Sequence, residues 1–106
     1  MNTYSKCPDK RSNQPRRNWT EAEVRQACKL YQRMLSAQVA GEKFVKAPAV
    51  RALAEKLQRS KGSVEAKLMN ISGVRSNMGQ SFVTGYKPLT SYAQSMVSIV
   101  AEIVRD

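Results

Sequence analysis

Two short apolar patterns separated by a brief polar break place the strongest constraint on how this chain folds. Each pattern repeats at the i, i+3, i+4, i+7 spacing of one helical face, with Val50, Leu53, Ala54 and Leu57 in the first and Val64, Leu68 and Ile71 in the second. The spacing predicts helices over about residues 48–58 and 61–71. Pro48 suits the first turn of a helix, where its missing N–H costs nothing, and Ser60 is a favoured N-cap.

A longer helix is predicted before this pair. Thr20 and Glu23 have the spacing of a capping box, and Trp19 can pack as the hydrophobic staple beside it. The apolar side chains that share one face of this helix are Val24, Ala27, Cys28, Tyr31, Met34 and Leu35. We expect the helix to cover about residues 20–39 and to end at Gly41. A long helix followed by two short helices and a tight polar turn is the helix-turn-helix arrangement, so the predicted fold class is mainly all-α.

Two connecting segments accompany these helices. The run EKFVKA follows the first helix, and we expect its Phe44 and Val45 to plug the core. Glycines and Pro88 interrupt residues 74–89, where a short run also has weak strand character. A loop or a small wing is therefore expected there.

The last segment is predicted to be a helix of unusual apolarity. Ser91 and Gln94 repeat the capping-box spacing and place the helix at about residues 92–104, with a β-strand over VSIVAEIV as the alternative. Its apolar surface is wider than a small core usually needs, so either the helix is well buried or one stripe packs on a second subunit or a protein partner. The candidate contact residues are Met96, Val97, Ile99, Val100, Ile103 and Val104.

Positive charge is concentrated in two parts of the chain. The net charge of the 106 residues is +10, of which residues 1–19 carry +4 and residues 46–80 carry +5. Such an excess favours polyanionic partners, because basic side chains neutralise phosphates and release counterions. The composition of residues 1–17 predicts a flexible basic arm, either a solubilising tail or a phosphate-contacting segment, before a single domain at 18–106. The arm residues proposed to contact phosphate are Arg16 and Arg17.

The composition also argues against several classes of function. The chain has no histidine, which removes the commonest general base and the commonest metal ligand, and its carboxylates form no recognisable catalytic constellation. We expect no enzymatic activity, no cofactor and no metal site. Cys7 lies in the polar arm and Cys28 on an apolar helical face, so we expect no bridge between them and a buried thiol at Cys28. Without an apolar run long enough for a membrane span or a leader, we expect a soluble cytoplasmic protein.

The third predicted helix has the chemistry of a reading helix. On the face opposite its apolar stripe, Gly62 and Ala66 leave the backbone nearly bare, and Asn70 is able to bond bidentately to adenine. Free N–H groups at the start of the helix can hold a phosphate. The DNA-binding residues expected in this region are Arg59, Ser60, Lys61, Gly62, Ser63, Ala66, Lys67 and Asn70.

The run RSKGSVEAKLMNIS at residues 59–72, followed by GYKPLTSYAQ at 85–94, resembles the N-terminal Myb-like helix-turn-helix region of a group of bacterial HNH restriction endonucleases. The start of the first helix, NWTEAEV, also looks similar. The resemblance implies DNA binding and adds Lys87 to the expected contacts. In that family a nuclease domain with metal-binding histidines follows, whereas this chain has no histidine. It therefore implies a targeting module without the cutting domain, either free-standing, a fragment of a longer protein, or a mimic that competes with such enzymes.

Two functional hypotheses follow from the sequence. The first is binding to double-stranded DNA, with the helix at about 61–71 in the major groove and the arm on the backbone. Neutralising ~5 phosphates predicts a slope of about −4 to −5 in log K against log salt. The second is a small protein-binding regulator of the phage or mobile-element type that acts on a nucleic-acid enzyme. RNA binding is a weaker option, because the chain lacks an aromatic-rich sheet for base stacking.

Overall fold

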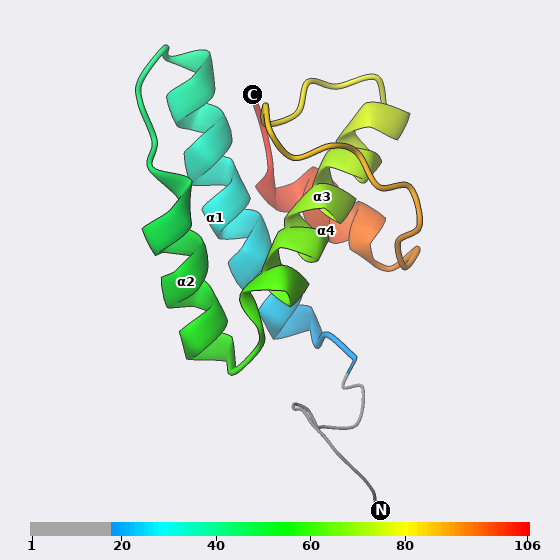
Figure 1. The fold of residues 1–106 in the computed structure, drawn as a ribbon. Helices are drawn as coiled ribbons and strands as arrows, with labels where there is room; N and C mark the ends of the chain where they lie inside the picture. Colours follow the sequence, from blue (N-terminus) through cyan, green and yellow to red (C-terminus); the bar gives the residue numbers. More distant parts are fainter. Residues whose placement is uncertain (1–17) are drawn as a thin grey trace, which may run out of the picture.

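The computed structural model describes residues 18–106 and contains helices and loops but no strand in that range. The helices are α1 (Glu21–Val39), α2 (Lys46–Leu57), α3 (Lys61–Asn77) and α4 (Met96–Ile103). Helices α1 and α2 run antiparallel, α3 packs on both, and α4 packs on α1 and α3 (Figure 1). The predicted all-α fold is confirmed, and the alternative of a strand at VSIVAEIV is wrong. The expected basic arm at 1–17 lies outside the described residues.

The first helix begins and ends as its sequence predicts. Thr20 Oγ1 accepts a hydrogen bond from the backbone N–H of Glu23 at 3.1 Å, and Glu23 Oε1 accepts one from the N–H of Thr20 at 3.0 Å. These reciprocal bonds form the predicted capping box. At the other end, Gly41 has a φ of +74°, a left-handed conformation that glycine adopts without steric cost. Helix α1 ends at Val39, just before this turn.

Helices α2 and α3 are joined by the tight turn expected for a helix-turn-helix. Gln58 adopts a left-handed conformation, with φ 55° and ψ 47°, and the N–H of Arg59 returns to the carbonyl of Ala54 at 2.9 Å. Ser60 Oγ then accepts a hydrogen bond from the N–H of Ser63 at 3.0 Å, so the predicted N-cap is confirmed. Helix α2 starts two residues earlier than expected, which leaves Pro48 within its first turn.

Helix α3 is longer than the sequence predicts, and it continues through Gly73, on which a distant loop lies. The helix continues through Gly73 and Val74 to Asn77 instead of ending near residue 71. A Cβ atom added at Gly73 would overlap the backbone carbonyl of Leu89, so the glycine lets a distant loop lie directly on the helix. The N–H of Leu89 donates to the carbonyl of Met69 at 3.0 Å. Gly73 is therefore the position inside α3 at which the loop docks on the helix.

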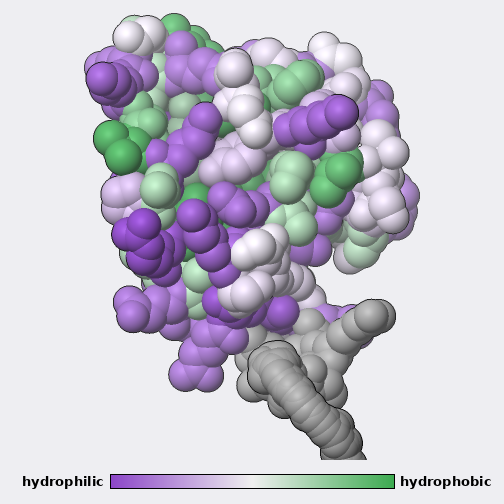
Figure 2. Space-filling model, viewed as in Figure 1, coloured by the Kyte–Doolittle hydropathy of each residue, from purple (hydrophilic) through white to green (hydrophobic). Residues whose placement is uncertain are grey.

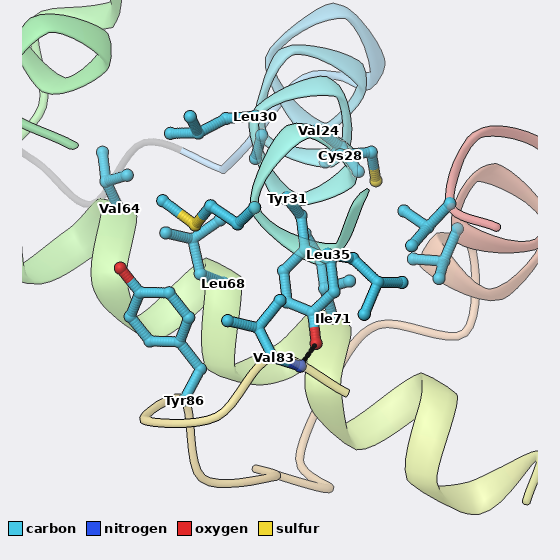
Figure 3. Close-up of a cluster of buried hydrophobic side chains, with 14 of the residues drawn as sticks. Val24, Cys28, Leu30, Tyr31, Leu35, Val64, Leu68, Ile71, Val83 and Tyr86 are labelled. Carbon is cyan, nitrogen blue, oxygen red and sulfur yellow. Dashed lines mark hydrogen bonds between the residues drawn. The ribbon is translucent and has the colours of Figure 1, made fainter. Parts of the chain in front are cut away.

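The segment between α3 and α4 is a loop that is fastened to the core. The hydroxyl of Tyr31 accepts a hydrogen bond from the N–H of Val83 at 2.8 Å and lies 2.7 Å from the hydroxyl of Ser72 (Figure 3). Gln38 of α1 bonds both the carbonyl of Phe82 and the N–H of Thr84, at 3.1 and 2.7 Å. The expected alternative of a small wing is not observed, because residues 78–95 form no strand.

A buried arginine joins the end of α3 to the chain that follows α4. Arg75 is 1% exposed, its Nε donates to the carbonyl of Ser81 at 2.8 Å, and its Nη1 donates to the carbonyl of Val104 at 3.2 Å. Its Nη2 pairs with the carboxylate of Asp106. Burying a guanidinium is costly unless its donors are satisfied, and these partners meet that need.

Helix α4 is shorter than predicted and its apolar residues belong to the core. It begins at Met96 after Ser95, so the capping box expected at Ser91 and Gln94 is not formed. Of the residues expected to contact a partner, the buried ones are Met96, Ile99, Val100 and Val104, and the partly buried ones are Val97 and Ile103. Helices α1 and α3 therefore cover most of the apolar surface of α4, as the alternative of a well-buried helix predicts, while Val97 and Ile103 stay partly exposed.

The core lies where α1, α3 and α4 meet. The predicted stripe of α3, Val64, Leu68 and Ile71, is fully buried, and Tyr31 and Leu35 of α1 pack in the same cluster (Figure 3). The connection after α1 departs from expectation: Phe44 is only partly buried, and Val45 is 66% exposed. Among the helices of residues 18–106, none combines the length and apolarity that a membrane crossing requires.

Candidate nucleic-acid interface

The first two turns of α3 form the open part of this helix. Ser60, Lys61 and Gly62 are exposed, and a Cβ atom added at Gly62 would meet nothing within 4 Å. Ser60 satisfies the N–H groups of Ser63 and Val64, so those of Lys61 and Gly62 remain at the exposed end of the helix. With the partial positive charge of a helix N-terminus, this end is suited to an anion.

The face opposite the apolar stripe is only partly open. Ser63, Glu65 and Ala66 are intermediate in exposure, between the exposed start of the helix and its buried stripe. Ala66 leaves no more than a methyl group on this face, as the sequence predicts. The most accessible part of this face is therefore the start of the helix, close to the backbone, and farther along the same face Met69 and Asn70 are again intermediate in exposure.

Arg59 is a structural residue and not a free phosphate contact. Its Nη2 donates to Glu23 Oε1 at 2.9 Å and to the carbonyl of Asn18 at 3.0 Å, while its Nε donates to Glu23 Oε2 at 3.2 Å. The guanidinium also lies 4.6 Å from the centre of the Trp19 ring. The side chains of Arg59 and Glu23 are 9% and 12% exposed. The expected phosphate contact is therefore replaced by an ion pair that joins α1 to the turn before α3.

Lys67 is also drawn into the domain. Its Nζ lies 5.2 Å from the centre of the Trp19 ring and 3.8 Å from the Sδ of Met96. Partial burial, together with the nearby charge of Arg59, lowers the pKa of the Lys67 ammonium. The ammonium thus packs between the starts of α1 and α4, which does not fit the expected role in contacting bases or phosphates.

Asn70 is held by the loop that covers the second half of α3. Its Nδ2 donates to the carbonyl of Leu89 at 3.3 Å and to the carbonyl of Ser91 at 3.1 Å. Bidentate recognition of adenine needs the amide N–H group free, and here both of its hydrogens have protein acceptors. The observed role of Asn70 is to fasten the loop, contrary to the expectation that it reads a base.

Lys87 remains exposed on the loop beside α3. The preceding Tyr86 is buried, and the ring points its hydroxyl toward Val64 in Figure 3. Burial is the main cause, and the nearby Glu65 a second cause, of a raised pKa for the Tyr86 hydroxyl. Lys87 therefore lies on a segment that packs against the first half of α3. Arg16 and Arg17, the remaining predicted contacts, fall outside the described residues.

A second set of cations was not singled out from the sequence. Exposed basic residues gather along α1, α2 and their connection: Lys29, Arg33, Lys43, Arg51 and Lys56. Figure 2 shows hydrophilic side chains over this half of the molecule, with hydrophobic ones between them. The signal was the i, i+4 spacing of Lys29 and Arg33 on the first helix. The spacing alone does not indicate a groove, because Phe44 and Val45 are expected to pack in the core, whereas Val45 is 66% exposed.

Residues 18–106 contain no group of three or more histidine, cysteine or acidic side chains arranged to hold a metal ion. Cys28 is buried among apolar side chains, as expected, and this burial raises the pKa of its thiol to about 12. A thiol held protonated in this way is a poor nucleophile and a poor metal ligand at neutral pH. The candidate chemistry of the described surface is therefore the binding of anions by cations and backbone N–H groups.

Comparison with known proteins adds no relative. The chain matches no protein-family model, no curated protein and no solved structure. The resemblance to the DNA-binding region of HNH restriction endonucleases accordingly stays a prediction from the motifs themselves.

Proposed function

We propose that this protein binds double-stranded DNA through the helix-turn-helix formed by α2 and α3, with the first two turns of α3 facing the major groove. The observation that carries the proposal is the open space over Gly62 at the exposed end of a helix whose other face is fully buried. A glycine in a helix costs roughly 0.5–1 kcal/mol relative to alanine. A glycine at this position would be useful if a ligand approaches the backbone closely, because no side chain stands in the way.

The phosphate-binding part of the proposal uses fewer side chains than the sequence suggested. Arg59 and Lys67 are engaged within the domain, which leaves Lys61, Lys87 and the N–H groups at the start of α3. Arg16 and Arg17 of the N-terminal segment are the other proposed contacts. With ~4 phosphates neutralised, the slope of log K against log salt should be about −3 to −4. Asn70 is not included in the proposed reading surface.

Binding to a labelled duplex of random sequence, measured by fluorescence anisotropy over a salt series, tests the proposal. We expect micromolar or tighter binding at ~50 mM salt and a steep loss of affinity toward ~200 mM salt. Absence of binding at the lower salt concentration, or an affinity that does not change with salt, would contradict it. Selection of bound sequences from the same random pool then shows whether the N-terminal half of α3 prefers particular bases.

A further inference from the structure

A groove between α1 and α2 has a composition that DNA binding does not explain. It is an open hollow of about 640 Å³ that is lined by both helices and by the connection between them. Its apolar lining includes Leu30, Val45, Pro48, Ala49 and Leu53. Val45 is among the most exposed of the large hydrophobic side chains in residues 18–106. Apolar surface of this kind at a concave site is typical of a binding groove.

The rim of the groove carries one sign of charge. Lys29 and Arg33 lie one turn apart on α1, Lys43 lies on the connection and Lys56 on α2. None of the described residues that line the groove is acidic. Two of these cations contact neutral groups: Arg33 lies 5.5 Å from the centre of the Phe44 ring, and Lys56 Nζ is 3.4 Å from Gln26 Oε1. The lining thus combines an apolar floor with uncompensated positive charge.

These two properties together select the chemistry of an occupant. A nucleic-acid backbone would pair with the cations but would leave the apolar floor in water. An uncharged apolar segment would cover the floor but bring no counter-charge to the lysines. Residues 1–19 of this chain carry a net charge of +4, and a second copy of the chain carries +10, so electrostatic repulsion disfavours both. A segment with apolar side chains on one face and carboxylates beside them satisfies both requirements.

We propose that the α1–α2 groove binds an acidic amphipathic helix of a partner protein. Helix α2 has 12 residues, so its groove is about 18 Å long and matches roughly three turns of a third helix laid along the antiparallel pair. Apolar side chains at i, i+3, i+4 and i+7 of the partner pack on the floor, and flanking carboxylates pair with Lys29, Arg33 and Lys56. This inference does not depend on DNA binding, because the groove uses none of the α3 residues proposed to contact DNA.

A synthetic peptide tests the proposal directly. A fluorescently labelled peptide of about 14 residues, with leucines on one helical face and glutamates on the other, is titrated into the full-length chain at ~50 mM salt. We expect a Kd of roughly 10–100 µM, and binding at least about tenfold weaker for a scrambled peptide of the same composition. A third peptide with lysines in place of the glutamates should not bind. No binding of the first peptide, or equal binding of the scrambled one, would overturn the proposal.

Matched variants show whether the peptide binds in the α1–α2 groove. Ala52→Glu introduces a carboxylate at an exposed position of the groove, and Ser98→Glu introduces the same charge at an exposed position of α4. We expect about tenfold weaker peptide binding for the first and an unchanged Kd for the second. Circular dichroism compares the melting temperature of Ala52→Glu with that of the wild type. If the two differ, the double variant Lys29→Ala/Arg33→Ala is used in its place. Equal loss in Ser98→Glu would indicate unspecific attraction and overturn the proposal.

Competition with duplex DNA separates this inference from the proposed function. If the groove binds protein, a duplex of about 20 base pairs should not displace the peptide at about 150 mM salt, a concentration that screens long-range attraction. Displacement by duplex, together with weaker DNA binding of Ala52→Glu, would assign the groove to nucleic acid and overturn the proposal. Peptide binding that persists in a chain that binds no duplex would refute the proposed DNA binding alone.

Discussion

Arg59 and Glu23 form an ion pair almost removed from solvent, with 2.9 Å between Nη2 and Oε1, and it joins the helix-turn-helix turn to the first turn of α1. Removing one partner of such a pair leaves the other charge largely buried without its ion-pair partner, which costs more than the pair itself contributes. We expect Arg59→Ala to lower the free energy of unfolding by about 2–4 kcal/mol, measured by urea denaturation.

Two further variants test whether the loss of stability comes from the buried ion pair. The double variant Arg59→Ala/Glu23→Ala should be less destabilised than the two single variants predict by addition, because neither charge is left alone. Arg25→Ala removes two ion pairs at the surface, with Glu21 and with Glu102, and should leave the urea midpoint nearly unchanged. Additive single and double variants would show that the buried pair is not coupled.

The glycines of α3 should respond to alanine in opposite directions. Gly73→Ala places a methyl group where the backbone of Leu89 lies, so we expect a loss of at least about 2 kcal/mol in the free energy of unfolding. Gly62→Ala enters open space in the first turn of the helix and should stabilise the domain, by less than the roughly 0.5–1 kcal/mol typical of a helix interior. Equal effects of the two substitutions in thermal or urea unfolding would contradict the proposed docking of the loop at Gly73.

Gly62→Ala also separates stability from binding. If α3 enters a groove with its backbone close to the bases, the added methyl group should weaken duplex binding in a variant that is more stable than the wild type. Anisotropy titration with one duplex at fixed salt measures this effect. Unchanged affinity would mean that the open space over Gly62 is not used for DNA.

Alkaline pH should destabilise the domain through Cys28. The thiol of Cys28 has an ordinary pKa near 9.0 when exposed and a pKa of about 12 when folded. Because the unfolded chain releases this proton first, the stabilising contribution is complete below pH 9.0 and is lost as the pH rises toward 12. One such group changes the free energy of unfolding by at most about 1.4 kcal/mol per pH unit.

The measurement is urea unfolding under reducing conditions between about pH 8 and 10, in the wild type and in Cys28→Ala. Truncating the side chain lowers stability at every pH by creating a small cavity. The test is therefore the slope with pH, which should be shallower in the variant than in the wild type. Parallel slopes would show that the Cys28 thiol does not titrate differently in the two states.

The predicted and unpredicted parts of the fold differ in how far apart the contacting residues are in the sequence. Periodicity and capping chemistry are local, so Ser60 as an N-cap and Val64 and Leu68 as core residues could be inferred from neighbouring letters. The role of Asn70 depends on carbonyl groups 19 and 21 residues away. A loop that returns to cover a helix leaves no periodic signal in the sequence of that helix. The glycine on which the loop lies, Gly73, is a residue type that often ends a helix, so the sequence does not show that α3 continues past it.

The same distinction applies to the charged residues. Sequence position alone made Arg59 a phosphate contact, whereas its carboxylate partner lies 36 residues earlier in α1. Arg75 lies within residues 74–89, for which the sequence predicts a loop or a small wing, and such a segment gives no reason to expect a buried side chain. The sequence does not indicate the groove cations, because an apolar residue in a connection, such as Val45, is expected to pack in the core. Residue type suggests charge or apolarity, but only tertiary packing determines which charges face a ligand.

Lys61→Ala and Lys87→Ala should weaken DNA binding without changing sequence preference. Each substitution removes one proposed phosphate contact, so the slope of log K against log salt should become shallower by ~0.9. Arg105→Ala is the matched control, because it removes an exposed cation near the C-terminus, away from the α2–α3 turn (Figure 1). A slope change in the control equal to that of Lys61→Ala would indicate attraction by net charge alone.

The loop fastened over the second half of α3 limits how much information the proposed DNA contact can carry. A helix that offers only its first two turns to a groove addresses about three or four base pairs. A sequence of that length recurs by chance every few hundred base pairs or less, so it cannot specify a unique site in a genome. A domain that binds DNA in the proposed way would therefore recognise only part of a longer site, and a second DNA-binding unit beside it would have to recognise the rest.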